Sequence, residues 1–100
     1  METPELVPKV LDIQELRQNI DRLDQEMLSV LARRMALIPK VAEYKKLNNV
    51  QRYQPGREKA VIESRRAIAE ELNINPDLAE KIMKLIIEDA HRIEEGIMGE

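Results

Sequence analysis

The chain has 100 residues, a length that predicts one domain. Cysteine, tryptophan and phenylalanine are absent, which excludes disulfides and cysteine-ligated metals and requires an aliphatic core. The single histidine argues against a histidine-based metal site. The formal net charge of -3 comes from interspersed acidic and basic residues, which argues against a nucleic-acid surface or binding to an anionic membrane.

The first 11 residues contain Pro4 and Pro8 without a clear period, and we expect them to form a loose arm within a single domain of residues 1–100. They lack the basic region and apolar stretch of a secretory signal. No apolar run approaches the roughly 20 residues that cross a bilayer. These features predict a cytoplasmic protein.

A long first helix is predicted from about residue 12 to residue 46. Asp12 and Glu15 have the spacing of a capping box at its start. We expect Pro39 to bend this helix rather than break it, because Pro39 lies away from the apolar seam. The seam occupies the a and d positions of a heptad: Ile13, Leu16, Ile20, Leu23, Met27, Val30, Leu37 and Val41.

Two shorter helices are predicted after a loop at residues 48–54. Pro55 suits the first turn of the second helix. After a short connection, Asn75-Pro76-Asp77 supplies an N-cap, a proline at the first helical position and an acid near the positive end of the dipole. The expected inner faces are Val61, Ile62, Arg65, Ile68 and Leu72 on the second helix and Leu78, Ile82, Leu85, Ile86 and Ile93 on the third.

The length of the first helix predicts the architecture. About 35 residues at 1.5 Å each extend roughly 50 Å, whereas a compact chain of this size has a radius of gyration of about 13 Å. The shorter helices cannot cover that whole stripe, so we expect an all-α, intertwined homodimer with three helices per chain. A plain coiled-coil dimer is the alternative.

Arg34 occupies an a position between Val30 and Leu37, where an apolar residue is expected. A guanidinium removed from water there needs an anionic partner, because an isolated buried charge is very costly. That partner is either a carboxylate of the chain or a small anionic ligand.

Two further cations flank the seam at e positions, Arg17 and Lys45. Arg34 and Lys45 share nearly one azimuth and are about 16 Å apart along the axis, so together they could hold a small dianion. Arg17 lies about 25 Å from Arg34, and only the Arg17 of a second, antiparallel copy could join them. Ordinary snorkelling of Arg17 and Lys45 is the alternative.

Two carboxylates on the shorter helices are candidate site residues, Glu58 and Glu94. Glu58 gains from the dipole at the start of the second helix, whereas its neighbour Arg57 does not. On the third helix the apolar stripe of Met83, Ile87 and Ala90 continues onto Glu94, which is either a site residue or a surface residue near a fraying end. His91 is predicted to be a solvated helix residue.

Taken together, these residues resemble the all-helical chorismate mutase family over about residues 12–95. The resemblance is carried by Arg17, Arg34, Lys45, Arg57-Glu58 and the run Leu-Ile-Ile-Glu-Asp at 85–89, with the strings at 16–24 and 31–34 around them. The stretch 54–58, followed by Ser64-Arg65-Arg66, looks most like mutase domains fused to prephenate dehydrogenase.

The resemblance implies an intertwined dimer that rearranges chorismate to prephenate in the Phe/Tyr branch of aromatic amino-acid biosynthesis, without cofactor or metal. Arg34 and the Arg17 of the partner subunit would hold the two substrate carboxylates. Lys45 would donate to the ether oxygen. Glu58 would accept from the ring hydroxyl, and Arg57 would support a carboxylate more loosely.

Three positions depart from the pattern of some members: Glu94 replaces a glutamine that donates to the ether oxygen, Gln54 replaces an aspartate and Ala90 replaces a serine. An ionised Glu94 only accepts hydrogen bonds, so this role requires its protonated form. The apolar stripe favours that form and nearby Lys45 opposes it.

Two other functions are compatible with the same cations. An isochorismate pyruvate lyase shares the fold and the arginine clamps, although the Arg57-Glu58 pair favours the mutase. A non-catalytic helical dimer that binds an aromatic-pathway metabolite would use the same clamps.

Overall fold

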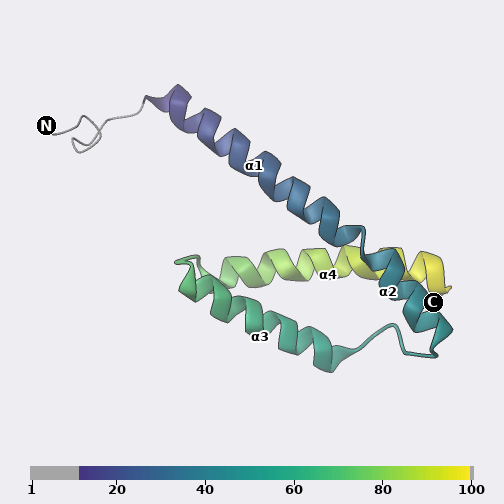
Figure 1. The fold of residues 1–100 in the computed structure, drawn as a ribbon. Helices are drawn as coiled ribbons and strands as arrows, with labels where there is room; N and C mark the ends of the chain where they lie inside the picture. The colour runs from purple at the N-terminus through teal and green to yellow at the C-terminus, as the bar shows by residue number, and fades with distance from the viewer. Residues whose placement is uncertain (1–11, 100) are drawn as a thin grey trace, which may run out of the picture. The chain divides into compact units, whose positions relative to one another are not determined.

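The computed structural model describes residues 12–99 of the chain. These residues form four helices, α1 (Ile13–Met35), α2 (Ile38–Leu47), α3 (Pro55–Glu71) and α4 (Pro76–Met98), and no strand (Figure 1). The all-α class is therefore confirmed. The arm expected at residues 1–11 lies outside the described residues.

The chain divides into two compact units, one ending at Arg34 and the other beginning at Met35. Among the described residues, the first unit contains α1 as far as Arg34, and the second contains α2, α3 and α4. Within residues 12–99, every helix is too short or too polar to span a bilayer.

Helix α1 begins with the predicted capping box. The backbone N–H of Glu15 donates to Asp12 Oδ1 at 2.8 Å, and the backbone N–H of Asp12 donates to Glu15 Oε1 at 3.3 Å. None of the residues of α1 is buried. Its heptad seam is exposed even at the middle of the helix, where Leu23 is 61% exposed. The seam that the sequence predicts is thus an uncovered apolar stripe.

The predicted first helix is interrupted just before Pro39. A turn at residues 36–37 separates α1 from α2, and Pro39 lies in the first turn of α2. Proline has no N–H to donate to the carbonyl of Met35, and its ring collides with that carbonyl in a continuous helix. Leu37 keeps helical backbone angles, with φ of -80° and ψ of -20°. The expectation of a bend without a break was therefore wrong.

In the second unit, α4 packs against both α2 and α3 (Figure 1). The apolar residues buried there are few and mostly small, and no large side chain in residues 12–99 is fully buried. The buried residues are Ala42 of α2, Val61 and Ala69 of α3, and Ala90 and Glu94 of α4. This core is small for a stable domain, since stability depends on the apolar area removed from water.

The connection between α3 and α4 has the predicted form. Asn73 adopts a positive φ of 60°, a conformation that asparagine tolerates better than most residues. The side chain of Asn75 caps α4 by accepting from the backbone N–H of Asp77 at 2.9 Å. Arg66 of α3 then bonds Asp77 and Glu80 of α4, both at 2.9 Å. A hydrogen bond from Lys84 holds the pKa of the Glu80 carboxyl below its ordinary value.

The inner faces of α3 and α4 differ in part from the prediction. On α3, Val61 is buried as predicted, but Ala69 is also buried while Ile68 and Leu72 are exposed. On α4, the expected face is exposed at Leu78, Ile82 and Leu85. The packed face is instead the second stripe, Met83, Ile87, Ala90 and Glu94. Helix α4 has two apolar faces, and the second unit covers only one of them.

Candidate functional site

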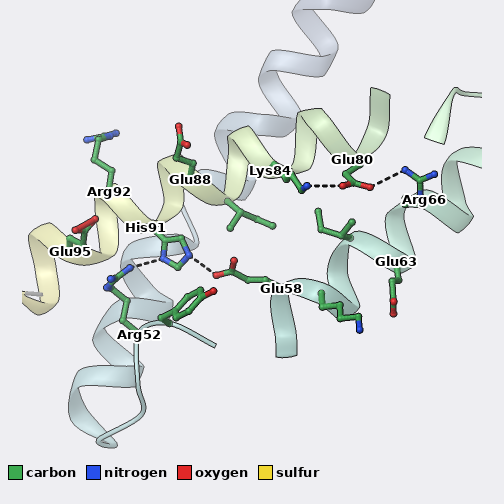
Figure 2. A pocket seen from close by; sticks show the side chains of 14 residues that line it. Arg52, Glu58, Glu63, Arg66, Glu80, Lys84, Glu88, His91, Arg92 and Glu95 are labelled. Carbon is green, nitrogen blue, oxygen red and sulfur yellow. Dashed lines mark hydrogen bonds and ion pairs between the residues drawn. The ribbon is translucent and has the colours of Figure 1, made fainter. Parts of the chain in front are cut away.

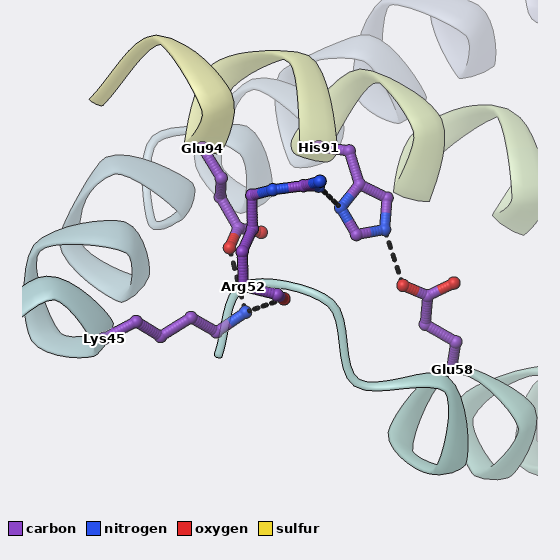
Figure 3. Close-up of polar contacts among 5 residues, drawn as sticks. All are labelled: Lys45, Arg52, Glu58, His91 and Glu94. Atoms are coloured by element: carbon purple, nitrogen blue, oxygen red, sulfur yellow. Dashed lines mark hydrogen bonds and ion pairs between the residues drawn. The ribbon is translucent and has the colours of Figure 1, made fainter. Parts of the chain in front are cut away.

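A buried ion pair joins α2 to α4 (Figure 3). Lys45 Nζ lies 2.8 Å from Glu94 Oε1, and it also donates to the backbone carbonyl of Arg52 at 2.9 Å. The side chains of Lys45 and Glu94 are 13% and 7% exposed. A charge this far from water requires a partner of opposite charge. Lys45 and Glu94, both candidate site residues from the sequence, are partners for each other.

Small residues allow this approach of α2 and α4. Ala42 precedes Lys45 by three positions and Ala90 precedes Glu94 by four, so each alanine lies on the same helical face as the charged residue that follows it. Both alanines are buried. A larger side chain at either position would hold the two helix backbones apart and lengthen the ion pair.

A second polar cluster lies beside the first and connects three segments (Figure 3). His91 Nε2 of α4 is 2.5 Å from Glu58 Oε2 of α3, and His91 Nδ1 is 2.7 Å from Arg52 Nη1 in the loop. The ring of Tyr53 meets the imidazole edge to face, with centroids 5.9 Å apart. The carboxylate of Glu58, a residue of α3, is thus fixed by a hydrogen bond with His91 of α4.

The prediction that His91 is a solvated helix residue was wrong, because its side chain is only 21% exposed and bonds on both sides. His91 follows Ile87 by four residues, which puts both on one face of α4. This spacing was the feature of the sequence that could have indicated that His91 is partly buried. Arg52 was also missed. Arg52 lies in a non-helical loop, where no periodicity indicates which way a side chain points.

An open groove of about 1030 Å³ lies between α3 and α4 (Figure 2). Glu58, His91 and Arg52 lie at one end, and Arg66, Glu80 and Lys84 lie at the other. Lys45 and Glu94 are not among its lining residues; Lys45 instead lines a smaller cavity of about 290 Å³ with residues of the loop. The Lys45–Glu94 pair is connected to the groove through Arg52, which lines the groove and whose backbone carbonyl accepts from Lys45.

The other candidate residues have simpler surroundings. Gln54 occupies the N-cap position of α3 without a capping hydrogen bond from its side chain, and Arg57 is exposed in the first turn. Ala90 is buried against the second unit's core. On α1, Arg17 is exposed and Arg34 is half-buried in the last turn.

The arrangement suits acid–base and electrostatic chemistry. An ammonium and a carboxyl group meet where water is largely excluded, so each acts more strongly on a bound molecule than it would in water. The described part of the chain has no group of three or more histidine, cysteine or acidic residues that could hold a metal ion.

The sequence matches the family described as chorismate mutase type II over residues 16–95. The chain belongs to that family. It is 34% identical over 85 residues to the T-protein of Enterobacter agglomerans, covering 85% of this chain and 23% of that protein. It is 29% identical over 86 residues to the chorismate mutase of Methanocaldococcus jannaschii, covering 86% of this chain and 87% of that protein.

A third relative is the 4-amino-4-deoxychorismate mutase of Streptomyces venezuelae, with 29% identity over 88 residues, 88% of this chain and 85% of that protein. The chorismate mutase resemblance drawn from the sequence is thus confirmed, over nearly the residues expected. The chain spans less than a quarter of the length of the two T-proteins that it matches.

Removal of Lys45 alone should destabilise this family member. Lys45→Ala leaves the Glu94 carboxylate buried without its cation, and breaking a buried ion pair in this way costs about 3–5 kcal/mol. Adding Glu94→Gln should recover much of the loss, because the amide carries no charge. Urea unfolding of the single and double variants at one fixed protein concentration measures both effects.

Lys84→Ala is the matched control, since Lys84 pairs with Glu80 at 2.7 Å and is itself 64% exposed. Exposed pairs contribute little to stability, so the unfolding midpoint should remain nearly unchanged. If the double variant is as unstable as Lys45→Ala, the buried charge of Glu94 is not the cause of the loss.

Proposed function

We propose that this chain is a chorismate mutase, which rearranges chorismate to prephenate without cofactor in the Phe/Tyr branch of aromatic amino-acid biosynthesis. The observation that carries the proposal is the buried contact between Lys45 and Glu94, with the Glu58 carboxylate fixed nearby, in a chain of the chorismate mutase type II family. The name of the Methanocaldococcus jannaschii relative, which it matches over most of both chains, supports the same activity.

The proposed reaction is intramolecular, so it needs no nucleophile. It needs the extended substrate held in the folded shape in which the new bond can form, and fixed charges can impose that shape. It also needs donors aimed at the ether oxygen, where negative charge grows as the C–O bond breaks. Lys45 is the primary donor, because its ammonium is already fixed by Glu94 and the Arg52 carbonyl.

Glu94 is the second donor in this mechanism. In the structure its Oε1 accepts from Lys45, as a carboxylate does. A bound ether oxygen that takes a hydrogen bond from Lys45 meets a carboxyl group at close range, and only the protonated carboxyl can donate to it.

Other residues hold the rest of the substrate. Glu58 accepts from the ring hydroxyl with a carboxylate that is already oriented. Arg57 is exposed beside it and supports a carboxylate only loosely. Gln54 and Ala90 complete the site without charge, at the start of α3 and one turn before Glu94.

The same proposal requires a homodimer. The seam of α1 is exposed throughout, and α4 leaves its second apolar face exposed. Arg17 and Arg34 are 17 residues apart on one helix, a separation of about 25 Å that no single small substrate bridges. We therefore assign the two carboxylates of chorismate to Arg34 and to Arg17 of the partner subunit, which makes each site a product of both chains.

The activity is tested by following the loss of chorismate absorbance with purified protein and identifying the product. Prephenate is the expected product. Pyruvate released from isochorismate would instead identify a lyase, and preference for 4-amino-4-deoxychorismate would place the chain with the Streptomyces venezuelae relative. Tight binding of chorismate without turnover would overturn the proposed activity in favour of a non-catalytic dimer.

Sites shared between subunits predict rescue of two inactive variants. Arg17→Ala and Arg34→Ala should each lose activity as homodimers. When the two are unfolded and refolded together, the heterodimer has one intact site and one doubly damaged site. Up to about half of the heterodimer's normal activity should return, because dimers of this kind have two equivalent sites. No rescue, with heterodimers demonstrated by mass, would assign both arginines to one chain's site.

The role of Glu94 predicts a particular pH profile. Activity of the wild-type protein should fall as the pH rises, because the ionised carboxylate cannot donate to the ether oxygen. Glu94→Gln should keep its activity at alkaline pH, since an amide donates at every pH. Measuring kcat across the pH range for both proteins tests this, with Glu95→Gln at the exposed neighbour as control. Superimposable wild-type and Glu94→Gln profiles would exclude Glu94 as a donor.

A further inference from the structure

His91 contributes a hydrogen bond that the mechanism above does not use. Its Nε2 lies 2.5 Å from Glu58 Oε2. Glu58 is in the first turn of α3 and its side chain is 30% exposed. A glutamate in that position can adopt several rotamers in water. The contact from α4 holds one of its two carboxylate oxygens in place.

The partners of His91 determine where its proton lies. Arg52 Nη1, at 2.7 Å from His91 Nδ1, belongs to a guanidinium, which only donates hydrogen bonds. The ionised carboxylate of Glu58, on the other side, only accepts them. An imidazole that bonds both must accept at Nδ1 and donate at Nε2. This is the neutral ring with its proton on Nε2.

Tyr53 also contacts the imidazole ring, edge to face at an interplanar angle of 62°. The other charged groups that line the groove around the ring are Lys59 and Glu63 of α3 and Glu88, Arg92 and Glu95 of α4. None of these has a hydrogen bond to His91 in the described part of the chain.

We propose that His91 is a positioning residue for Glu58, with Arg52 selecting the imidazole tautomer that donates. This inference rests on the proposed function, in which Glu58 accepts from the substrate ring. The N–H of His91 fixes Oε2 and leaves Oε1 to accept from the substrate. A carboxylate held in this way selects a ring that carries a hydrogen-bond donor, such as a hydroxyl, at the position facing Oε1.

A double-mutant cycle tests whether His91 acts through Glu58. His91→Leu, which cannot donate, should lower kcat/KM about 10-fold or more, the usual consequence of losing one hydrogen bond to a charged group. His91→Gln should recover part of that loss, because its amide N–H can donate. In the Glu58→Ala background, His91→Leu should have no further effect. Asp89→Asn on the exposed side of α4, where Asp89 pairs with Arg92, is the control and should keep normal kcat/KM.

Equal losses from His91→Leu in the wild-type and Glu58→Ala backgrounds would overturn the inference, because His91 would then act independently of Glu58. Unchanged kcat/KM in His91→Leu would overturn it as well. If wild-type protein has no activity on chorismate, the proposed function fails first. The predicted tautomer of His91 and its dependence on Arg52 therefore need a measurement that does not depend on turnover.

Nitrogen NMR of the imidazole provides that readout, since the chain has a single histidine. In tag-free wild-type protein at mildly alkaline pH, Nε2 should carry the proton and Nδ1 should not. Arg52→Leu removes the donor to Nδ1 and should allow the second tautomer to appear. A wild-type ring protonated on Nδ1, or a mixture unaffected by Arg52→Leu, would contradict the arrangement whether or not the protein is a mutase.

Discussion

The buried ion pair between Lys45 and Glu94 is the contact on which the rest of the second unit depends. It joins α2 to α4, and through the Arg52 carbonyl it also fixes the loop that leads to α3. Two charges removed from water are costly, and their attraction offsets that cost only when the geometry is close.

The loop fixed by Lys45 is also the source of Arg52 and Tyr53, which contact His91. His91 in turn contacts Glu58. The polar groups of α2, the loop, α4 and α3 therefore form one connected arrangement, in which moving the Lys45–Glu94 pair would displace the carboxylate on α3. In the proposed function, this connection would put the charges in place before the reaction begins, which is the basis of pre-organised electrostatic catalysis.

Whereas the polar groups of this connected arrangement are paired with one another, most of the large apolar residues remain exposed. The core of residues 35–99 consists mainly of alanines and Val61, while the seam of α1 and one face of α4 are exposed. Hydrophobic burial is the dominant favourable term in folding. We propose that a second copy supplies the missing burial, and the position of Arg17 on that exposed helix connects assembly with activity.

The sequence by itself determined the helical class, the capped starts at Asp12 and Asn75, the loop at 48–54 and the family, because these depend on local spacing and local hydrogen bonds. It also selected Lys45 from its place beside the apolar seam and Glu94 from its place on an apolar stripe of the last helix. The tertiary structure decided which of the two apolar faces of α4 is packed. It also brought Arg52, His91 and Glu58 together across 39 residues of sequence. Periodicity along one helix carries no information about which partner packs against which face, so only the packed helices reveal that contact.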